Sequence, residues 1–385
     1  MIVIVEGKRS PIGSFNGSLS KISLQEITKQ VIAKLLEASQ VHPEMVTEVI
    51  MGQVLTGGFG QNTARQVALL AGLRQETRAY LVNQVCGSGI KSIRLACQSL
   101  LEEEGIILAG GQESMSLSPH QVHLRRSNFG PVTLEDSVVS DGLTDAFNKI
   151  HMGMTAERLA EEYKITREEQ DFFAFQSQEK ASKAQMAGLF NEEIVSIETH
   201  KGLVVEKDED IRSDSSLEKL AKLKPAFKKD GTVTAGNASG INDGSAILLM
   251  MREERAKKLG LKPLAKIVSF GEAALDPMLM GIAPVPASQL ALQKAGWDIS
   301  ELDLLEVNEA FAVQSIAVNN LMGWAPEKVN VNGGAIALGH PIGMSGTRIV
   351  LHLIKEMQRR KVTKGLATAC IGGGMGIAIT LELYL

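Results

Sequence analysis

Cysteine is scarce in this sequence, because only Cys86, Cys97 and Cys370 occur among its 385 residues. An odd number of cysteines without a C-x-x-C pair provides neither a disulfide framework nor the usual spacing of a zinc site. We therefore expect no metal centre. Each cysteine has to be explained by packing or by a chemical role of its own.

Long apolar runs and dense positive charge are also missing. The longest apolar run, 246–251, has six residues, whereas a membrane-spanning helix needs about 18 or more. The net charge is −4, and no stripe of basic residues interleaved with aromatics indicates a nucleic-acid surface. The first residues lack a signal-peptide pattern and the last are not a peroxisomal address. The sequence predicts a cytoplasmic protein that binds neither membranes nor nucleic acids.

Two common nucleotide-binding motifs are absent as well. The segment 372–377 begins like G-x-G-x-x-G, but Ile377 stands at the last position. No G-x-x-x-x-G-K-[ST] occurs beside an expected strand. A dinucleotide or P-loop site is therefore a poor interpretation, and we expect no resident cofactor.

The order of the expected elements indicates an α/β fold. Apolar runs of strand length alternate with helical periodicity up to residue 111 and again from about residue 263, as in α/β proteins. The middle differs, because it carries mixed charge and a polar helical stretch. The pattern predicts a first half, an inserted loop domain and a second half, at 1–115 plus 242–262, 116–241 and 263–385 respectively.

The two flanking halves resemble each other. Without gaps, "ASQVHPEMVTEVI" from Ala38 aligns with "AGWDISELDLLEV" from Ala295, an offset of 257 residues. The same offset relates Cys86 to Gly343, and each lies in a glycine-rich turn that leads into an amphipathic helix. In the second helix the apolar positions are opposed by a polar face of Arg348, His352, Lys355 and Arg359. A pseudo-symmetric protein would bring the two helix N-termini together.

Cys86 is the first candidate for chemistry. In "NQVCGSGI" it stands where a helix begins, and the positive end of a helix favours a thiolate and lowers the cysteine pKa. The following glycines allow a tight turn whose amides are free to bind an oxyanion. The alternative, a buried structural cysteine, suits Cys97 better, because it lies further along the same helical face.

Three more residues are candidates for the same site. His340 lies in "GGAIALGHPIGMSG", a stretch too rich in glycine for a strand and too kinked for a helix. The repeat sets it opposite Cys86, and a Cys-His couple is the usual arrangement for an activated thiolate. Cys370 ends an expected strand before three glycines, where a thiol can move a proton. Asn308 follows another expected strand in "EVNEAFA".

These motifs together resemble those of a known family. "NQVCGSGI", "GGQESMS", "TVTAGNASGINDG", "VNEAFA", "GGAIALGHPIGMSG" and "CIGGGMGIA" look like thiolases, and more closely the acetyl-CoA C-acetyltransferase or biosynthetic branch. The similarity runs from Arg9 to the end of the chain. It implies the thiolase fold: two pseudo-symmetric βαβαβαββ halves in a layered αβαβα arrangement, with a coenzyme A-binding loop domain inserted into the first. It also implies a homotetramer, a dimer of dimers.

The resemblance implies a role for each catalytic position. Cys86 would take an acetyl group from one acetyl-CoA, and His340 would deprotonate it. Asn308 would hold a water in the oxyanion hole that His340 helps to form. Cys370 would remove the α-proton of the second acetyl-CoA, and the amides of Cys86 and Gly372 would form a second oxyanion hole. An oxyanion-hole donor contributes about 3 to 4 kcal/mol to a transition state, so two holes would make the enolate and the tetrahedral adduct accessible.

The resemblance also implies the substrate side of the site. Coenzyme A thioesters would be substrates, in a reversible condensation of two acetyl-CoA to acetoacetyl-CoA and CoA within fatty acid metabolism. The bulky side chain at Met280 is similar to that of the thiolases that act on short acyl chains. Met154 and Ile282 differ from the usual residues of those enzymes. The implied pantetheine, acyl-pocket and adenine positions are Ser239, His151, Leu143, Met152, Phe227, Phe311 and Arg212.

Several alternatives stay open at this stage. A broader-range degradative 3-ketoacyl-CoA thiolase would use the same chemistry. A ketoacyl synthase would have the same fold but a Cys-His-His or Cys-His-Asn site, whereas the third catalytic position in this chain is Cys370. An acyl-CoA-binding protein without turnover would not need four intact catalytic positions. We also predict that mild oxidation joins Cys86 to Cys370, provided that their Cα atoms lie within about 7 Å.

Overall fold

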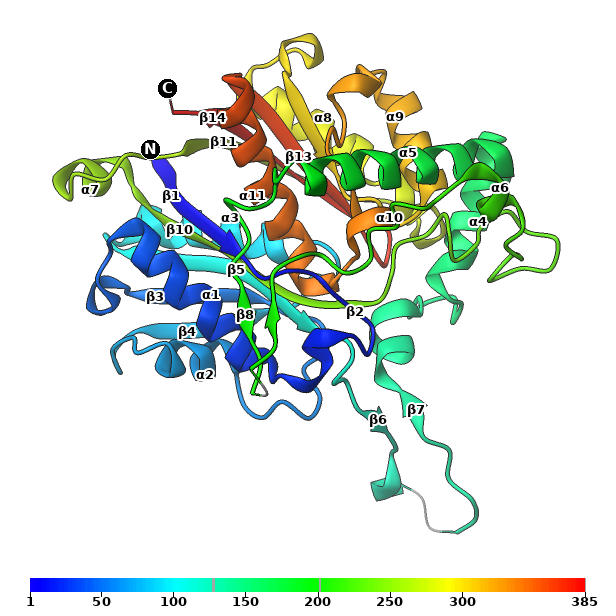
Figure 1. Ribbon diagram of the computed structural model, residues 1–385, viewed down its shortest axis with the longest axis horizontal. Coiled ribbons are helices and arrows are strands. Elements are labelled where there is room, and N and C mark those ends of the chain that lie inside the picture. Colours follow the sequence, from blue (N-terminus) through cyan, green and yellow to red (C-terminus); the bar gives the residue numbers. More distant parts are fainter. Residues whose placement is uncertain (127–128, 201, 385) are drawn as a thin grey trace.

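The computed structural model describes residues 1–126, 129–200 and 202–384. Within these ranges no helix is long and apolar enough to cross a membrane. The main feature of the structure is a large mixed sheet around which the helices pack in layers (Figure 1).

Among the described residues, the main sheet has ten strands, in the order β12-β13-β14-β11-β1-β10-β5-β3-β4 with β2 beside β10. Neighbours β3 and β5, and likewise β12 and β13, run parallel, while the pairs β5–β10 and β13–β14 are antiparallel. The strands are β1 (Ile2–Arg9), β2 (Gly13–Ser14), β3 (Glu48–Gly52), β4 (Arg78–Val82), β5 (Ile106–Ser114), β10 (Asn242–Arg252), β11 (Ala265–Ala274), β12 (Leu304–Val307), β13 (Lys364–Ile371) and β14 (Met375–Leu383).

The helices cover the sheet on both sides and also fill the space between its two halves. They are α1 (Leu24–Ser39), α2 (Thr63–Leu70), α3 (Ser88–Glu102), α4 (Met152–Tyr163), α5 (Arg167–Met186), α6 (Leu217–Ala221), α7 (Glu253–Lys258), α8 (Pro284–Ala295), α9 (Ala312–Met322), α10 (Ala335–Leu338) and α11 (Ile342–Arg360). Helices α1 and α2 pack on the strands of the first half and α8 on those of the second. Helices α3 and α11 lie between the halves, which gives five layers.

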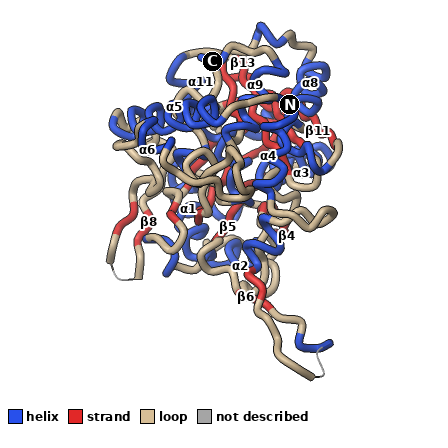
Figure 2. Tube along the Cα trace, turned by 90° about the vertical axis from the view of Figure 1, so that its right-hand side faces the viewer, coloured by secondary structure: helices blue, strands red, loops and turns tan. Residues whose placement is uncertain are grey.

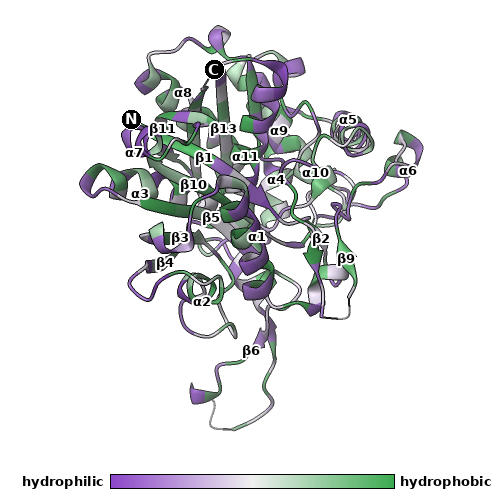
Figure 3. Cartoon of the chain, turned by 60° about the vertical axis from the view of Figure 1, so that its left-hand side comes forward, coloured by the Kyte–Doolittle hydropathy of each residue, from purple (hydrophilic) through white to green (hydrophobic). Residues whose placement is uncertain are grey.

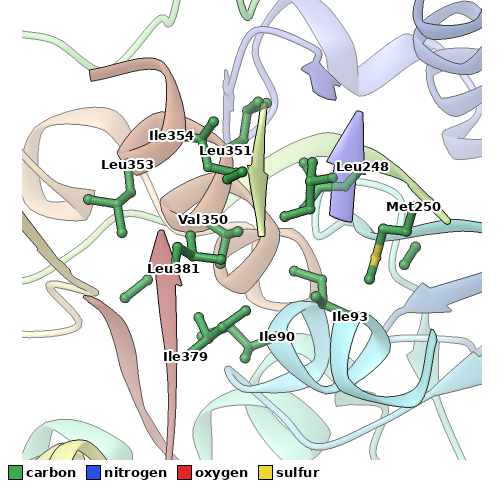
Figure 4. Close-up of a cluster of buried hydrophobic side chains, with 14 of the residues drawn as sticks. Ile90, Ile93, Leu248, Met250, Val350, Leu351, Leu353, Ile354, Ile379 and Leu381 are labelled. Carbon is green, nitrogen blue, oxygen red and sulfur yellow. The ribbon is translucent and has the colours of Figure 1, made fainter. Parts of the chain in front are cut away.

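The largest core cluster lies around α3 and α11. Ile90 and Ile93 of α3 meet Val350, Leu353 and other residues of α11, together with side chains from strands of both halves (Figure 4). In Figure 3 the central strands are mostly hydrophobic in colour, because a strand covered on both faces needs apolar side chains on both. The largest core is therefore shared between the halves, and a second core of nearly equal size lies between the first-half strands and α1 and α2.

The two central helices cross at a pair of glycines. A Cβ at Gly89 would lie 2.5 Å from Thr347 N, and one at Gly346 would lie 2.6 Å from Ile90 N. Gly89 and Gly346 are 257 residues apart, the offset at which the two halves align in sequence. The repeat thus appears in space as two equivalent helices that touch at equivalent residues.

The expected polar face of the second central helix is wrong at three of its four residues, because only Arg359 is exposed. Helix α11 is buried from Ile342 to Met357, its charged residues included. Arg348 Nη1 lies 3.2 Å from Glu306 Oε2, and His352 Nδ1 lies 2.9 Å from Glu193 Oε2. The helix is covered on all sides by the two sheet halves and the insert, so each charge needs a buried counter-charge.

The segment 116–241 leaves the first half after β5 and returns at β10. It contains α4, α5, α6 and two small hairpins, β6–β7 (His120–Gln121, Glu135–Asp136) and β8–β9 (Ile197–Glu198, Val204–Val205). The β6–β7 hairpin extends away from the body of the molecule in both ribbon and tube views (Figures 1 and 2). Its limits as an inserted domain stay a prediction, because the chain path alone does not define a separately folding unit.

Candidate active site

The turn before α3 holds Cys86 in a strained backbone. Val85 has φ of 45°, a left-handed conformation that is costly for a β-branched residue. Ser88 Oγ accepts from Gln84 N at 2.8 Å and donates to Val85 O at 2.7 Å, while Val85 N donates to Asn83 Oδ1 at 3.0 Å. These bonds hold the strained turn, which places Cys86 one residue before the helix N-cap.

His340 lies between α10 and α11, in a defined orientation. Its backbone N donates to Asn242 Oδ1 at 2.9 Å, and its Nδ1 lies 2.5 Å from Ser345 Oγ. The Ser345 hydroxyl gives its single proton to Pro341 O at 2.9 Å, so it accepts from His340 Nδ1–H. The other ring nitrogen, Nε2, is then unprotonated and available as a base. The sequence expectation of an entirely non-helical stretch was wrong in part, since Ala335–Leu338 forms α10.

Asn308 lies next to His340 but does not line the cavity that His340 lines. It follows β12, and its Nδ2 lies 3.4 Å from His340 Nε2. Within the described chain, its Oδ1 is buried and has no hydrogen-bond partner. The amide therefore presents a free acceptor beside the imidazole, which a water molecule would satisfy.

Cys370 and Gly372 approach from the second half. Cys370 is a fully buried residue near the end of β13, and the chain then turns through three glycines into β14. The amide of Gly372 donates toward the Cys86 sulfur. The N-terminus of α3 from the first half and the end of β13 from the second half thus bring both thiols to one cavity, and both are free. The predicted oxidative link between them stays a prediction.

These residues surround a cavity of about 300 Å³. It is lined mainly by apolar groups. The predicted residues that line it are Cys86, His340, Cys370, Gly372, Ser239, His151, Leu143, Met152, Phe227, Met280 and Phe311. Asn308 does not line it, and Arg212 lines a neighbouring cavity of about 190 Å³ that shares Ala235, Ala238 and Gly240 with the first.

An aromatic row forms one wall of the cavity. The ring of His151 stacks on Phe227 with centroids 4.6 Å apart, and Phe227 meets Phe311 edge-on at 6.2 Å. His151 is also the N-cap of α4, where its Nδ1 accepts from Gly153 N at 3.0 Å. A Cβ at Gly153 would lie 2.2 Å from the Phe227 ring, so glycine is required for this packing.

Burial decides the charge state of the reactive groups. Burial of the Cys86 sulfur raises its pKa to about 11, although the Gly372 amide lowers it. The prediction of a lowered pKa at the helix N-terminus was therefore wrong. Burial also raises the pKa of Cys370, and the nearby Cys86 adds to this shift. Burial lowers the pKa of His340 to about 4, helped by the Arg348 charge. At neutral pH the free site thus holds neutral thiols and a neutral imidazole.

Sequence reasoning missed the residues that orient the predicted ones. Ser345 and Asn242 fix the His340 ring and backbone, and Val85 carries the strain beside Cys86. Ser345 lies five residues after His340 in the same motif, which is a signal that could have been used. Asn242 lies in the quoted "GNASGINDG" motif, but nothing in the sequence relates it to a histidine 98 residues later.

Comparison with known proteins finds two family models that together span nearly the whole chain. The models "Thiolase, N-terminal domain" and "Thiolase, C-terminal domain" match residues 2–254 and 261–383. The chain belongs to the thiolase family. An acetyl-CoA acetyltransferase of Chromobacterium violaceum is 55% identical over 388 residues, which cover 99% of each chain.

Solved structures agree in fold with this thiolase. An acetyl-CoA acetyltransferase of Bacillus anthracis is 45% identical with a TM-score of 0.96, over 99% of this chain and 98% of that one. A human mitochondrial 3-ketoacyl-CoA thiolase in complex with CoA is 44% identical with a TM-score of 0.95, over the same shares. The thiolase fold predicted from the motifs is confirmed. In the described part of the chain, no group of three or more His, Cys, Asp or Glu is placed to hold a metal ion.

The raised pKa of Cys86 predicts a specific pH profile. Without substrate, the rate constant for alkylation of Cys86 by iodoacetamide should rise about tenfold per pH unit from pH 7 to 10, because only the thiolate reacts. The thiolate fraction keeps growing below a pKa of about 11. Peptide mass spectrometry separates Cys86 from the buried Cys97. A plateau below pH 9 would instead reveal a thiolate-imidazolium pair.

Proposed function

We propose that this thiolase is an acetyl-CoA C-acetyltransferase, which condenses two acetyl-CoA to acetoacetyl-CoA and CoA and also catalyses the reverse. The observation that carries the proposal is the convergence of Cys86, His340 and Cys370 on one cavity. Relatives that are 52–55% identical over nearly the whole chain and bear this name support the same substrate.

We assign the first half-reaction to Cys86 and His340. The unprotonated Nε2 of His340 takes the proton of Cys86 as its sulfur attacks the thioester carbonyl of acetyl-CoA. The developing oxyanion is bound by protonated His340 and by the water that Asn308 would hold. Collapse breaks the carbon–sulfur bond to CoA, and the Cys370 thiol protonates the leaving CoA thiolate. The products are S-acetyl-Cys86, CoA, a Cys370 thiolate and a protonated His340.

The second half-reaction uses the thiolate that this step leaves behind. Cys370 removes an α-proton from a second acetyl-CoA, and the resulting enolate carbon attacks the acetyl group on Cys86. The amides of Cys86 and Gly372 bind the oxyanion of the tetrahedral adduct, which releases acetoacetyl-CoA and the Cys86 thiolate. Protonated His340 returns its proton to Cys86. All protons are accounted for without a metal or a resident cofactor, and the thioesters are the only substrates.

The two adjoining cavities suit the two ends of coenzyme A. We assign the apolar cavity to pantetheine and the acyl group. Ser239 and the aromatic row of His151, Phe227 and Phe311 line it, as do Leu143, Met152 and Met280. The neighbouring cavity is more polar and is lined by Arg212 and Lys219 together with Asp210 and Asp214. We assign it to the adenine end, where the basic groups face a nucleotide.

Assembly and location rest on the family resemblance alone. We propose a homotetramer, a dimer of dimers, that works in the cytoplasm within fatty acid metabolism. The chemistry is reversible, so the physiological direction depends on the concentrations of acetyl-CoA, acetoacetyl-CoA and CoA rather than on the site.

The acyl-enzyme gives the most direct test of the function. Acetyl-CoA incubated with the protein and quenched in acid should leave one acetyl group on the peptide that contains Cys86. The variant Cys86→Ala should show none, whereas Cys97→Ala should acetylate like the wild type because that thiol only packs in the core. A label found on another residue, or none in the wild type, would refute the assignment.

The role of Cys370 predicts a separation of the two half-reactions. The variant Cys370→Ala should still acetylate Cys86, although more slowly, since His340 starts that step and a CoA thiolate can leave without the proton that Cys370 provides. Its full turnover should be at least about 100-fold slower, the usual contribution of a general base. It should also lose exchange of the acetyl-CoA methyl protons with D₂O, measured by NMR. Exchange at the wild-type rate would assign the base elsewhere.

Chain length separates this proposal from a broader-range 3-ketoacyl-CoA thiolase. Met280 is buried and lines the cavity, and we assign to its side chain the far end of the acyl site. We expect kcat/KM for thiolysis of acetoacetyl-CoA to exceed that for 3-ketodecanoyl-CoA by about tenfold or more, since each excluded methylene costs roughly 1 kcal/mol. The variant Met280→Ala should narrow this ratio. Equal values in the wild type would favour the broader enzyme.

A further inference from the structure

The histidine segment is bound to a buried carboxylate at each of its ends. His340 lies within residues 336–343, which run from α10 to the first turn of α11. The backbone N of Ile336 donates to Glu309 Oε2 at 3.2 Å, and that of Gly343 donates to Glu113 Oε2 at 2.8 Å. Glu309 and Glu113 are 1% and 0% exposed. Neither carboxylate has a role in the mechanism above.

Glu309 links three separate parts of the chain. Its Oε1 accepts from Asn330 Nδ2 at 2.8 Å, and its Oε2 accepts from Ser177 Oγ at 2.7 Å as well as from Ile336 N. Ser177 belongs to α5 of the insert, and its Oγ also accepts from Gly334 N at 3.1 Å. A Cβ at Gly334 would lie 2.2 Å from the Glu309 carboxyl carbon. The chain before His340 is therefore packed directly on this carboxylate.

Glu113 links the two halves of the molecule. It stands near the end of β5, and its carboxylate accepts from Leu55 N at 3.0 Å, Val54 N at 3.1 Å and Gly343 N. The last of these amides belongs to the N-terminus of α11, where a negative charge is stabilised by the helix dipole. Val54 and Leu55 follow β3 of the first half. One carboxylate thus fixes the start of the second central helix against the first half.

Only an ionised carboxylate satisfies either set of donors. The partners of Glu113 are three backbone amides, which cannot accept a hydrogen bond. Asn330 Nδ2 is fixed as a donor because it also donates to Val307 O, while Asn330 Oδ1 accepts from Val307 N. A glutamine at either position would point its amide group at a donor, and an unsatisfied buried group weakens the contact. Replacing either glutamate by glutamine therefore breaks the contact while the volume of the side chain stays nearly the same.

We propose that Glu309 and Glu113 are positioning residues for His340, which hold the two ends of 336–343 so that the imidazole faces Cys86. The proposal rests on the proposed function, because it takes His340 as the base of the first half-reaction. A displacement of about 1 Å at a reacting group can cost about 100-fold in rate. Loss of either carboxylate should therefore slow acetylation of Cys86 at saturating acetyl-CoA by about 10- to 100-fold.

The chain offers a matched control in Glu157. This residue is 3% exposed in α4 and also accepts from three donors, Thr232 N, Thr232 Oγ1 and Val233 N, but it fixes a part of the insert away from His340. The variants Glu309→Gln, Glu113→Gln and Glu157→Gln remove the same charge from equally buried sites. Ser177→Ala is a milder change that removes one donor to Glu309, and it replaces Glu309→Gln if that variant does not fold.

Two measurements decide the proposal, and both are made at pH 8. Burial raises the pKa of Glu113 to about 7, so its carboxyl group is largely ionised at this pH. The first is the single-turnover rate of Cys86 acetylation by saturating acetyl-CoA in a rapid-quench experiment, with KM measured separately. The second is hydrogen–deuterium exchange of the peptide over 336–343 in the free protein, which needs no substrate. The thermal midpoint of each variant is recorded to compare their stabilities.

We expect Glu309→Gln and Glu113→Gln to lose acetylation rate with little change in KM and to exchange faster at 336–343. Glu157→Gln should lose comparable stability, yet acetylate within about threefold of the wild type, because the reacting groups stay in place. An unchanged acetylation rate in the first two variants, unchanged exchange at 336–343, or an equal loss in Glu157→Gln would each overturn the proposal. A wild type that never acetylates would refute the proposed function instead, while the exchange data would still test whether the carboxylates hold the segment.

Discussion

The structure depends on the close crossing of α3 and α11. Two glycines, Gly89 and Gly346, let the backbones meet where no Cβ would fit. Because the helices start on either side of this point, their N-terminal turns and the chain before them lie close together. Cys86 precedes one helix and His340 the other, so a packing constraint in the core sets the geometry of the reactive pair. The ends of β5 and β13 then complete the same region from each half.

Burial is also the dominant electrostatic influence on the reactive groups. The helix N-terminus and the Gly372 amide both favour a thiolate at Cys86, but desolvation outweighs them and raises its pKa to about 11. His340 is held as a neutral base for the same reason, with its proton directed to Ser345. Reactive groups that are neutral at rest avoid the cost of burying an ion pair beside an apolar substrate channel. Charge then develops only when a substrate carbonyl is present to receive the sulfur.

The sequence predicts the fold well where the signal is local or repeated. The offset of 257 residues relates Gly89 to Gly346 as well as Cys86 to Gly343, and the family resemblance implies eleven residues that line one cavity. Prediction from the sequence fails where the burial of a side chain depends on the whole molecule. The periodicity of α11 predicts that its charged side faces solvent, although Arg348 and His352 are buried. The pattern cannot show that the insert covers that side. The hydrogen bonds of Ser345 and Asn242 to His340 are also tertiary contacts that no spacing rule reveals.

The ion pairs of Arg9 have a consequence for the evolution of the chain. Arg9 lies in β1 of the first half and is 0% exposed, and both of its ion-pair partners belong to the segment 116–241: Glu193 at 2.8 Å and Asp208 at 2.7 Å. Removing one partner of a buried pair typically costs about 3–5 kcal/mol, a large part of the stability of a typical domain. A shortened relative without that segment would therefore need a neutral residue in place of the arginine. At these positions β1 and the segment 116–241 therefore have to change together.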